Sequence, residues 1–266
     1  QAVAIDEIKK FIAEQELHES NRYIPETVNH EGKQFEQKIA IIGAGPAGMS
    51  AAYYLRCKGY PVDIFEKEKT PGGMILNGIP SFRLEEQVIE AEVDVLRKMG
   101  IGFKCGVEVG RDITIEQLRQ QGYKAFYIAI GAQGGRKLGI AGEDADGVIA
   151  GVEFLKKINP DEKSAHIKGR TVVVGGGNVA VDVARTALRA GASEVTMVCL
   201  EDRASMPAAK DEIEEALEEN ITINNSWGPR RYSQPEVRLR GLYSGSVQPY
   251  VMHRDDSIHS MMRMIR

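Results

Sequence analysis

Two glycine-rich turns, each placed directly after an apolar run, are the segments of this sequence best suited to chemistry. The first follows the run 38–42 and reads Gly43-Ala44-Gly45-Pro46-Ala47-Gly48. Glycines at these spacings allow a tight bend, a close approach of backbone N–H groups to phosphate, and close packing of the helix that follows. Glu66 ends the next apolar run, 23 residues after Gly43, where a carboxylate can accept a hydrogen bond from a ribose hydroxyl. The pattern predicts a site for the pyrophosphate and ribose of a dinucleotide.

The second turn follows the run 171–174 and reads Gly175-Gly176-Gly177-Asn178-Val179-Ala180. Alanine replaces the third glycine, which this pattern tolerates. Glu201 comes 26 residues after Gly175, directly after a predicted strand at 194–200. Its carboxylate would accept a hydrogen bond from a free ribose 2′-hydroxyl and repel a 2′-phosphate, which favours NADH. Arg203 could instead bind that phosphate, so NADPH stays open.

The elements around both turns follow one order: strand, glycine turn, helix, strand. This order predicts an α/β fold of two Rossmann-like, doubly wound nucleotide-binding domains after a short N-terminal helical segment. The expected boundaries are 1–37 for the N-terminal helix and linker, 38–147 for the first nucleotide-binding domain, 148–228 for the second, and 229–266 for an atypical tail. The tail carries seven arginines against three acidic residues and shows no lasting helix or strand period, so we expect it to be poorly ordered.

Outside the two turns, the apolar pattern predicts further elements. An amphipathic helix is expected at 4–17, whose apolar stripe needs a partner; the stripe comprises Ile5, Ile8, Phe11, Ile12 and Leu17. The other predicted helices lie at 49–58, 85–99, 114–121, 152–157 and 208–219, and one more follows the second glycine turn and ends at 190. The other predicted strands lie at 62–66, 101–104, 125–130 and 221–223.

Composition excludes several classes of protein. The chain has 266 residues, a net charge of −4 and three cysteines, Cys57, Cys105 and Cys199, which are far apart. A disulfide scaffold, a structural zinc site, an iron–sulfur cluster within this chain and a paired-thiol reductase centre are therefore not expected. Isolated reduced thiols indicate a cytoplasmic protein. The acidic balance disfavours nucleic acid as a partner, and no apolar run reaches the ~18 residues that a membrane helix requires.

Two dinucleotide sites in one chain suggest a relay in which one cofactor stays bound and the other exchanges. A flavin facing a nicotinamide meets that description. In such a relay, the protein aligns two rings, and no side chain has to act as a general acid or base. We therefore predict no catalytic side chain and no metal site in this chain.

Three runs of the sequence resemble the small (beta) subunit of NAD(P)H-dependent glutamate synthase: IAIIGAGPAGMSAAYYL, EKEKTPGGMILNGIPSFRL and VVVGGGNVAVDVARTALRAGA. The flavin half of dihydropyrimidine dehydrogenase and NAD(P)H:ferredoxin-type bifurcating subunits are similar in layout. The resemblance covers residues 4–228. It implies that Ala44 to Gly48 hold the pyrophosphate of FAD and Glu66 its ribose, and that Gly176 to Val179 hold the pyrophosphate of the nicotinamide coenzyme. For the rest of the FAD it implies contacts from Gly72, Gly73, Met74, Arg83, Gly131 and the backbone of Val109.

The chain departs from this family in three ways. Members that use NADPH commonly carry paired arginines where this chain has Leu200-Glu201, which again favours NADH. The family's cysteine-rich iron–sulfur segment precedes the first helix, so 1–37 is expected to be the remnant of that domain. The Ala-Gly-Asp turn through which the family returns to complete its flavin domain is missing, so domain 38–147 is expected to be incomplete.

The function implied by the resemblance is that of an FAD-dependent NAD(P)H oxidoreductase. Hydride would pass to FAD, and electrons would leave through iron–sulfur clusters outside this chain. The electron-accepting partner would be a glutamate synthase large subunit or a ferredoxin-like domain. The alternative is a truncated dinucleotide-binding module without turnover of its own that serves as an assembly partner.

Overall fold

The computed structural model describes residues 3–17, 19, 22–26, 35–135, 137–159 and 166–228. The atypical tail at 229–266 lies outside the described residues. The chain divides into two compact units, and the first ends at Ala132. Asn77–Pro80 belong with the second unit. The division differs from the boundary expected at 147 because the chain leaves the first sheet directly after its last strand.

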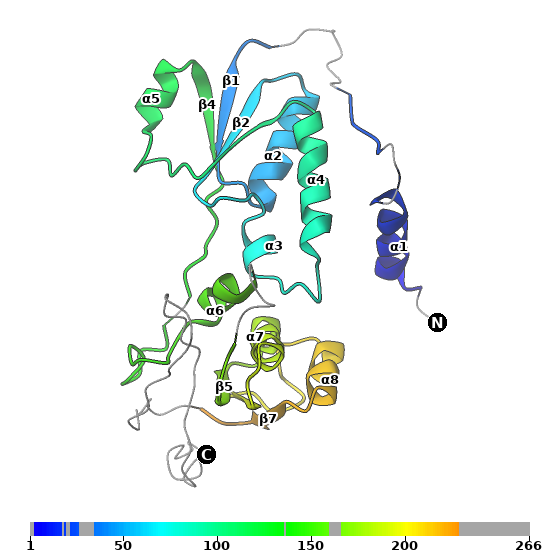
Figure 1. Ribbon diagram of the computed structural model, residues 1–266, viewed down its shortest axis with the longest axis vertical. Helices are drawn as coiled ribbons and strands as arrows, with labels where there is room; N and C mark the ends of the chain where they lie inside the picture. Colours follow the sequence, from blue (N-terminus) through cyan, green and yellow to red (C-terminus); the bar gives the residue numbers. More distant parts are fainter. Residues whose placement is uncertain are drawn as a thin grey trace. The chain divides into compact units, whose positions relative to one another are not determined.

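The first unit is built on a parallel four-stranded sheet in the order β3-β2-β1-β4 (Figure 1). Its strands are β1 (Lys38–Ile42), β2 (Val62–Glu66), β3 (Gly102–Cys105) and β4 (Tyr123–Ile128), and its helices include α2 (Pro46–Cys57), α4 (Glu86–Lys98) and α5 (Ile115–Gln120). Ile39 and Ile41 pack with α2 and α4 residues, whereas Ala40 packs with Leu118 of α5. Alternate residues of β1 therefore face two covered sides, which explains its unbroken apolar sequence.

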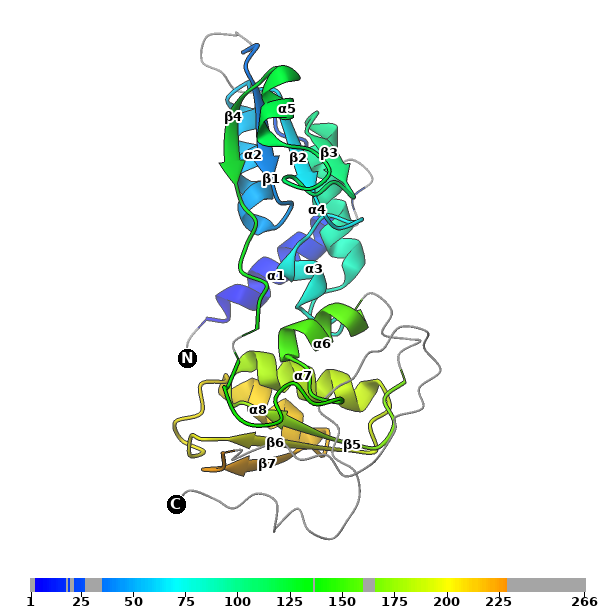
Figure 2. The same ribbon diagram turned by 90° about the vertical axis from the view of Figure 1, so that its left-hand side faces the viewer.

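The second unit repeats the arrangement with a parallel sheet in the order β5-β6-β7. Its strands are β5 (Arg170–Val174), β6 (Glu194–Cys199) and β7 (Thr222–Asn225), and its helices are α6 (Gly151–Ile158), α7 (Asn178–Arg189) and α8 (Lys210–Glu218). Figure 2 shows α7 and α8 over the same face of this sheet. Phe154, Val181 and Met197 lie in one core that joins helices to sheet. The predicted α/β class is confirmed, with one parallel sheet in each of the two units.

The observed bounds differ from the predicted ones by up to three residues; two of the differences have a local reason, and one element was not predicted. Helix α2 begins at Pro46 instead of 49, because proline at the first helical position gives up no hydrogen bond. The strand expected at 125–130 lies at Tyr123–Ile128, because Tyr123 pairs with Lys38 before a register shift. The short helix α3 (Met74–Asn77) was not predicted, since four residues show no period.

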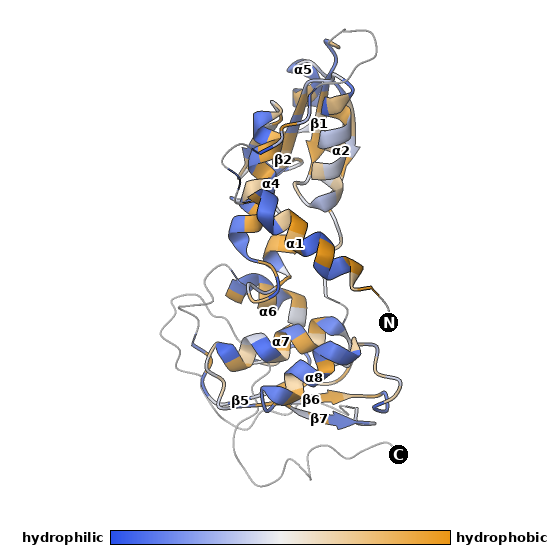
Figure 3. Ribbon diagram, turned by 90° about the vertical axis from the view of Figure 1, so that its right-hand side faces the viewer, coloured by the Kyte–Doolittle hydropathy of each residue, from blue (hydrophilic) through white to orange (hydrophobic). Residues whose placement is uncertain are grey.

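Helix α1 (Ile5–Leu17) confirms the predicted N-terminal helix, but none of its residues is buried. Its apolar residues alternate with charged ones along the ribbon in Figure 3, and Ile5, Phe11 and Ile12 are each about 60% exposed. The partner that the stripe needs is therefore absent among the described residues.

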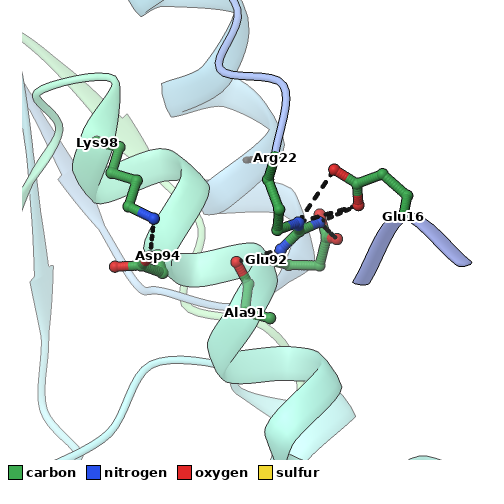
Figure 4. Close-up of polar contacts among 6 residues, drawn as sticks. All are labelled: Glu16, Arg22, Ala91, Glu92, Asp94 and Lys98. Carbon is green, nitrogen blue, oxygen red and sulfur yellow. Dashed lines mark hydrogen bonds and ion pairs between the residues drawn. The ribbon is translucent and has the colours of Figure 1, made fainter. Parts of the chain in front are cut away.

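A single arginine connects α1 to α4 (Figure 4). The Arg22 guanidinium donates to the Glu16 carboxylate at 2.7 Å, to the Glu92 carboxylate at 2.7 Å and to the Ala91 carbonyl at 2.7 Å. These hydrogen bonds to Glu16 and Glu92 raise the pKa of Arg22 above its ordinary range. Arg22 thus fixes one end of α1 while the apolar stripe stays exposed.

Candidate functional site: two nucleotide cradles

The first glycine turn has the geometry that its sequence predicts. Gly43 adopts a φ of +107°, and a Cβ there would lie 2.3 Å from the carbonyl oxygen of Ala129 in the chain after β4. A Cβ on Gly48 would lie 1.9 Å from the Gly43 carbonyl oxygen. Both glycines are therefore required by the packing of turn, strand and helix. Around Gly45 there is space, because the nearest atom to a Cβ would be 3.9 Å away.

The Glu66 carboxylate points at this turn from the end of β2. One oxygen accepts the Ala44 N–H at 2.7 Å and the other accepts the Glu68 N–H at 2.9 Å. Glu66 is only 6% exposed, so these two donors offset part of the cost of burying its charge. The structure thus brings Glu66 to the glycine turn, as predicted from its spacing.

The second predicted part of this cradle, Gly72 and Gly73, packs directly on the turn. The Gly72 N–H donates to the Ala44 carbonyl at 2.9 Å, and a Cβ on Gly73 would lie 2.8 Å from the Cα of Gly45. Both have positive φ, +136° and +56°, which side chains disfavour. Met74 follows as the first residue of α3.

The remaining predicted FAD contacts are placed less directly. The backbone leading to Val109 runs beside Glu66, since the Val107 N–H donates to the Glu66 carbonyl at 2.9 Å, and the Val109 side chain packs with Phe65. Gly131, with a φ of +69°, follows the chain segment that touches Gly43. Arg83 is half-buried with its guanidinium 5.9 Å from the Phe82 ring centroid. The contacts of Val109, Gly131 and Arg83 with FAD stay predictions.

The second glycine turn repeats the first. Gly175 donates its N–H to the Val198 carbonyl at 2.8 Å, as Gly43 does to the Phe65 carbonyl at 2.8 Å. Gly175 has a φ of +147°, and a Cβ there would lie 3.2 Å from the Ala180 Cβ. The absence of a side chain at Gly175 explains why alanine fits at the third position. A Cβ on Gly177 would meet nothing within 4 Å.

Glu201 and Arg203, the two residues with opposite implications for the coenzyme, occupy different places. A Cβ on Gly176 would lie 3.0 Å from the Glu201 carboxylate, so Glu201 faces the turn. Arg203 is exposed in a loop held by Asp202, whose carboxylate accepts the Ser205 N–H at 2.8 Å. That hydrogen bond and the one from the Ser205 hydroxyl lower the pKa of Asp202. The geometry therefore brings Glu201 to the second cradle and leaves Arg203 exposed two residues later.

A brace behind the second turn was not predicted. The Asn178 amide oxygen accepts the Ala209 N–H at 3.0 Å, and the Gly176 carbonyl accepts the Ala208 N–H at 3.0 Å. The segment before α8 thus holds the turn in place. Sequence spacing did not show this contact because the two segments are about 30 residues apart.

The first turns of α2 and α7 are the parts of these cradles that can bind an anion. Their N-cap residues are Gly45 and Gly177, and neither is capped by a side-chain hydrogen bond. Backbone N–H groups at such a helix end, together with the helix dipole, attract phosphate. A Cβ would meet no atom closer than 3.9 Å at Gly45 and none within 4 Å at Gly177, so the described residues leave both helix ends open to a pyrophosphate, the group that FAD and nicotinamide coenzymes share.

The three cysteines are free thiols, two half-buried and Cys199 buried. Burial raises the pKa of Cys105 and of Cys199, so both are neutral thiols with little nucleophilic character. Within the described ranges, no three metal-binding side chains come together. No helix of that same part of the chain is long and apolar enough to cross a membrane.

Comparison with known proteins places this geometry in a family. Residues 37–226, which include both cradles, match the family model of the pyridine nucleotide-disulphide oxidoreductases. The chain belongs to this family. Despite the family name, the three cysteines of this member lie too far apart in sequence to form an adjacent redox pair.

Several curated members of the family are similar in sequence. The chain is 42% identical over 209 residues to the NADP(+)-dependent formate dehydrogenase subunit beta of Moorella thermoacetica, covering 77% of this chain and 29% of the relative. It is 40% identical to the NAD-dependent dihydropyrimidine dehydrogenase subunit PreT of Escherichia coli (77% and 50%) and 36% identical to the glutamate synthase [NADPH] small chain of the same organism (92% and 52%). The resemblance to the glutamate synthase small subunit is confirmed. The chain spans about half or less of the length of these relatives.

Solved structures support the fold. FprA of Mycobacterium tuberculosis, which has been solved in complex with NADPH, superposes with a TM-score of 0.56 and 27% identity, covering 68% of this chain and 47% of that one. The thioredoxin reductase of Lactococcus lactis gives a TM-score of 0.53 at 22% identity, covering 75% and 68%. The second likeness concerns the fold alone.

Proposed function

We propose that this chain is the nucleotide-binding part of a flavoprotein oxidoreductase that draws reducing equivalents from NADH through FAD. One observation carries the proposal: the chain contains two strand–turn–helix cradles, each with a glutamate directed at the second residue of the turn. Glu66 reaches Ala44 in the first cradle, and Glu201 approaches Gly176 in the second. Two such sites serve a protein that pairs a resident cofactor with an exchanging one.

The first cradle is proposed to hold FAD. When bound, FAD supplies the capacity to accept two electrons together and to release them singly. The N–H groups at the start of α2 would bind its pyrophosphate, and Glu66 would accept a hydrogen bond from its ribose. Gly72 and Gly73, which pack against the turn where a side chain would clash, would present their backbone to the rest of the cofactor. No side chain of this chain is assigned a proton-transfer role.

The second cradle is proposed to hold NADH. Glu201 faces the turn, where its carboxylate would bind a free 2′-hydroxyl and repel a 2′-phosphate, whereas Arg203 is exposed in the loop around Asp202. The names of the relatives include both NAD- and NADP-dependent proteins, so the choice of coenzyme rests on these residues. NADPH is the alternative that the test below separates.

Electrons are proposed to leave this chain through iron–sulfur clusters that lie outside it. The three cysteines are far apart in sequence, and three of the relatives are named as subunits or as a small chain. The partner would be a glutamate synthase large subunit or a ferredoxin-like domain. Three unpaired cysteines are also the ground for proposing a cytoplasmic location.

One observation favours the second candidate, an assembly module without turnover of its own. Strand β4 lies at the edge of the first sheet, and Tyr127, Ile128 and Ile130 are 45%, 59% and 65% exposed. An exposed apolar edge strand is a surface that another polypeptide can cover. Such a module would bind a partner without having to hold FAD.

The test is the visible absorbance of the purified chain after incubation with FAD and removal of the excess. Retained flavin absorbance that bleaches under anaerobic conditions with NADH, and much more slowly with NADPH, would support the proposal. Gly45→Ala serves as the control and should reduce flavin retention, because its methyl group enters the cradle without a clash, 3.9 Å from the Gly73 Cα. A chain that retains no flavin would overturn the proposal in favour of the assembly module, and equal bleaching by NADPH would overturn the preference for NADH.

A further inference from the structure

The two cradles hold their glutamates by different means. Both carboxylate oxygens of Glu66 accept backbone N–H groups, from Ala44 and Glu68. In the described part of the chain, no hydrogen bond reaches the Glu201 carboxylate, although it lies 3.0 Å from a Cβ built on Gly176. The position of Glu201 therefore has to be set through its backbone.

The end of β7 binds that backbone. The Ser226 N–H donates to the Glu201 carbonyl at 3.0 Å. The Asn225 side-chain amide donates to the same carbonyl at 3.3 Å and to the Cys199 sulfur at 3.3 Å. The Trp227 N–H donates to the Cys199 carbonyl at 2.8 Å. Asn225 to Trp227 thus hold the chain on both sides of Leu200, whose side chain is 76% exposed.

Backbone strain marks this contact as one that the fold maintains. Ser226 has a φ of +60°, in the left-handed region that residues other than glycine seldom adopt. The glycine turn packs tightly on the end of β6, because a Cβ on Gly176 would lie 2.9 Å from the Cys199 Cβ. Any shift of the Cys199–Glu201 backbone would therefore change how the carboxylate meets the turn.

We propose that Asn225 is a positioning residue that holds Glu201 toward Gly176 and so makes the second cradle select a coenzyme with a free ribose 2′-hydroxyl. The inference rests on the proposed binding of a nicotinamide coenzyme to this cradle. Without Asn225, the Glu201 backbone keeps the Ser226 hydrogen bond but loses the side-chain one. The carboxylate then samples other positions, which weakens both its hydrogen bond to the 2′-hydroxyl and its repulsion of a 2′-phosphate.

The test measures binding of two fragments, ADP-ribose and 2′-phospho-ADP-ribose, to the full 266-residue chain by calorimetry. Neither fragment carries a nicotinamide ring, so the result does not depend on turnover. The variants are Asn225→Ala and the near-isosteric Asn225→Leu. The matched control is Asn224→Ala, since Asn224 precedes Asn225 on β7 and its side chain bonds to no described residue. The fluorescence of Trp227, the single tryptophan, gives a second readout, because the Trp227 N–H binds the Cys199 carbonyl and a change in packing there would shift the emission.

The wild type and Asn224→Ala are expected to bind ADP-ribose at least about tenfold more tightly than 2′-phospho-ADP-ribose. Both Asn225 variants are expected to lower this ratio of affinities about fivefold. A general structural role would weaken both ligands alike, so the ratio is the deciding quantity. If Asn225→Ala lowers the unfolding temperature, the ratio of the two affinities in Asn225→Leu is the deciding result. Unchanged ratios in both variants would overturn the role of Asn225. If the wild type binds neither fragment, the proposed function of the cradle fails instead.

Discussion

At the residue scale, Gly48 and Gly177 illustrate two different reasons for glycine in a nucleotide-type turn. A Cβ on Gly48 would overlap the Gly43 carbonyl oxygen at 1.9 Å, whereas a Cβ on Gly177 would meet no atom within 4 Å. Gly177 also has an ordinary φ of −96°. The packing of the protein therefore requires glycine at 48, whereas at 177 we propose that the approach of a ligand requires it.

This contrast predicts opposite effects of alanine. Gly177→Ala should lower the free energy of unfolding by about 1 kcal/mol or less, the cost of alanine at an N-cap, but reduce the affinity for ADP-ribose at least about tenfold because the methyl group occupies the phosphate position. Gly48→Ala should lower the free energy of unfolding by about 3 kcal/mol through overpacking. Denaturant unfolding and calorimetry give the two quantities. Wild-type affinity in Gly177→Ala would show that the pyrophosphate does not bind at this turn.

At the scale of elements, α7 and α8 are joined by an ion-pair network. Arg185 of α7, whose side chain is 9% exposed, pairs with Glu215 and, at 2.7 Å, with Glu219. Arg189 also pairs with Glu219 at 2.7 Å. Because the second glycine turn leads directly into α7, these pairs help to hold the cradle in its unit.

The network predicts a pH dependence. Burial works to raise the pKa of Glu219, but hydrogen bonds from Arg185 and Arg189 outweigh it and hold that pKa below its ordinary value of 4.5. A lowered folded-state pKa means that the contribution to stability is complete above pH 4.5 and is lost as the pH falls below it. Glu219→Gln should lower the free energy of unfolding by about 1–3 kcal/mol at pH 7. The variant should also lose less stability than the wild type as the pH falls below 4.5. Glu218→Gln, the exposed neighbour, is the control; an equal loss in both variants would contradict the role of the pairs.

The second connection at this scale, between α1 and α4, depends on Arg22. Helix α1 has no buried residue, and a 13-residue helix without packing is marginally stable in water. Arg22→Ala should therefore accelerate hydrogen exchange throughout α1 and leave the exchange of β1 unchanged. Lys98→Ala removes an exposed ion pair with Asp94 on the same helix α4, and exposed pairs contribute little. Exchange in α1 that is equally slow in Arg22→Ala and in the wild type would show that another contact holds the helix.

At the scale of the whole molecule, each unit has its own hydrophobic core and its own cradle. A ligand stabilises the structure to which it binds, by about 2.7 kcal/mol at a concentration 100 times its Kd. We expect FAD to slow hydrogen exchange in β1 and α2, and ADP-ribose to slow it in β5 and α7. Mass spectrometry of exchanged peptides can follow both units in one sample. Protection of β1 and α2 by ADP-ribose alone would contradict this assignment of the cradles.

Local sequence patterns were sufficient to predict most of the fold and the centre of each cradle. Burial of β1, β2, β5 and β6 follows from their apolar runs, and the places of Gly43, Gly48 and Glu66 follow from spacing, because a strand–turn–helix unit fixes its own geometry over about 30 residues. The short helix α3 and the brace of Asn178 by Ala209 could not be predicted in this way. Both depend on packing between segments with no local signature.

Sequence alone thus determined that the chain contains two strand–turn–helix units with glycine-rich turns, since each unit lies within a continuous motif. Only the tertiary structure showed where Glu201 and Arg203 lie, because their spacing of two residues does not place either side chain. Arg203 is exposed in the loop held by Asp202, and the end of β7 binds the Glu201 backbone beside Gly176. The physical reason is that the position of a side chain depends on its backbone. That backbone is held by hydrogen bonds from segments that are distant in sequence.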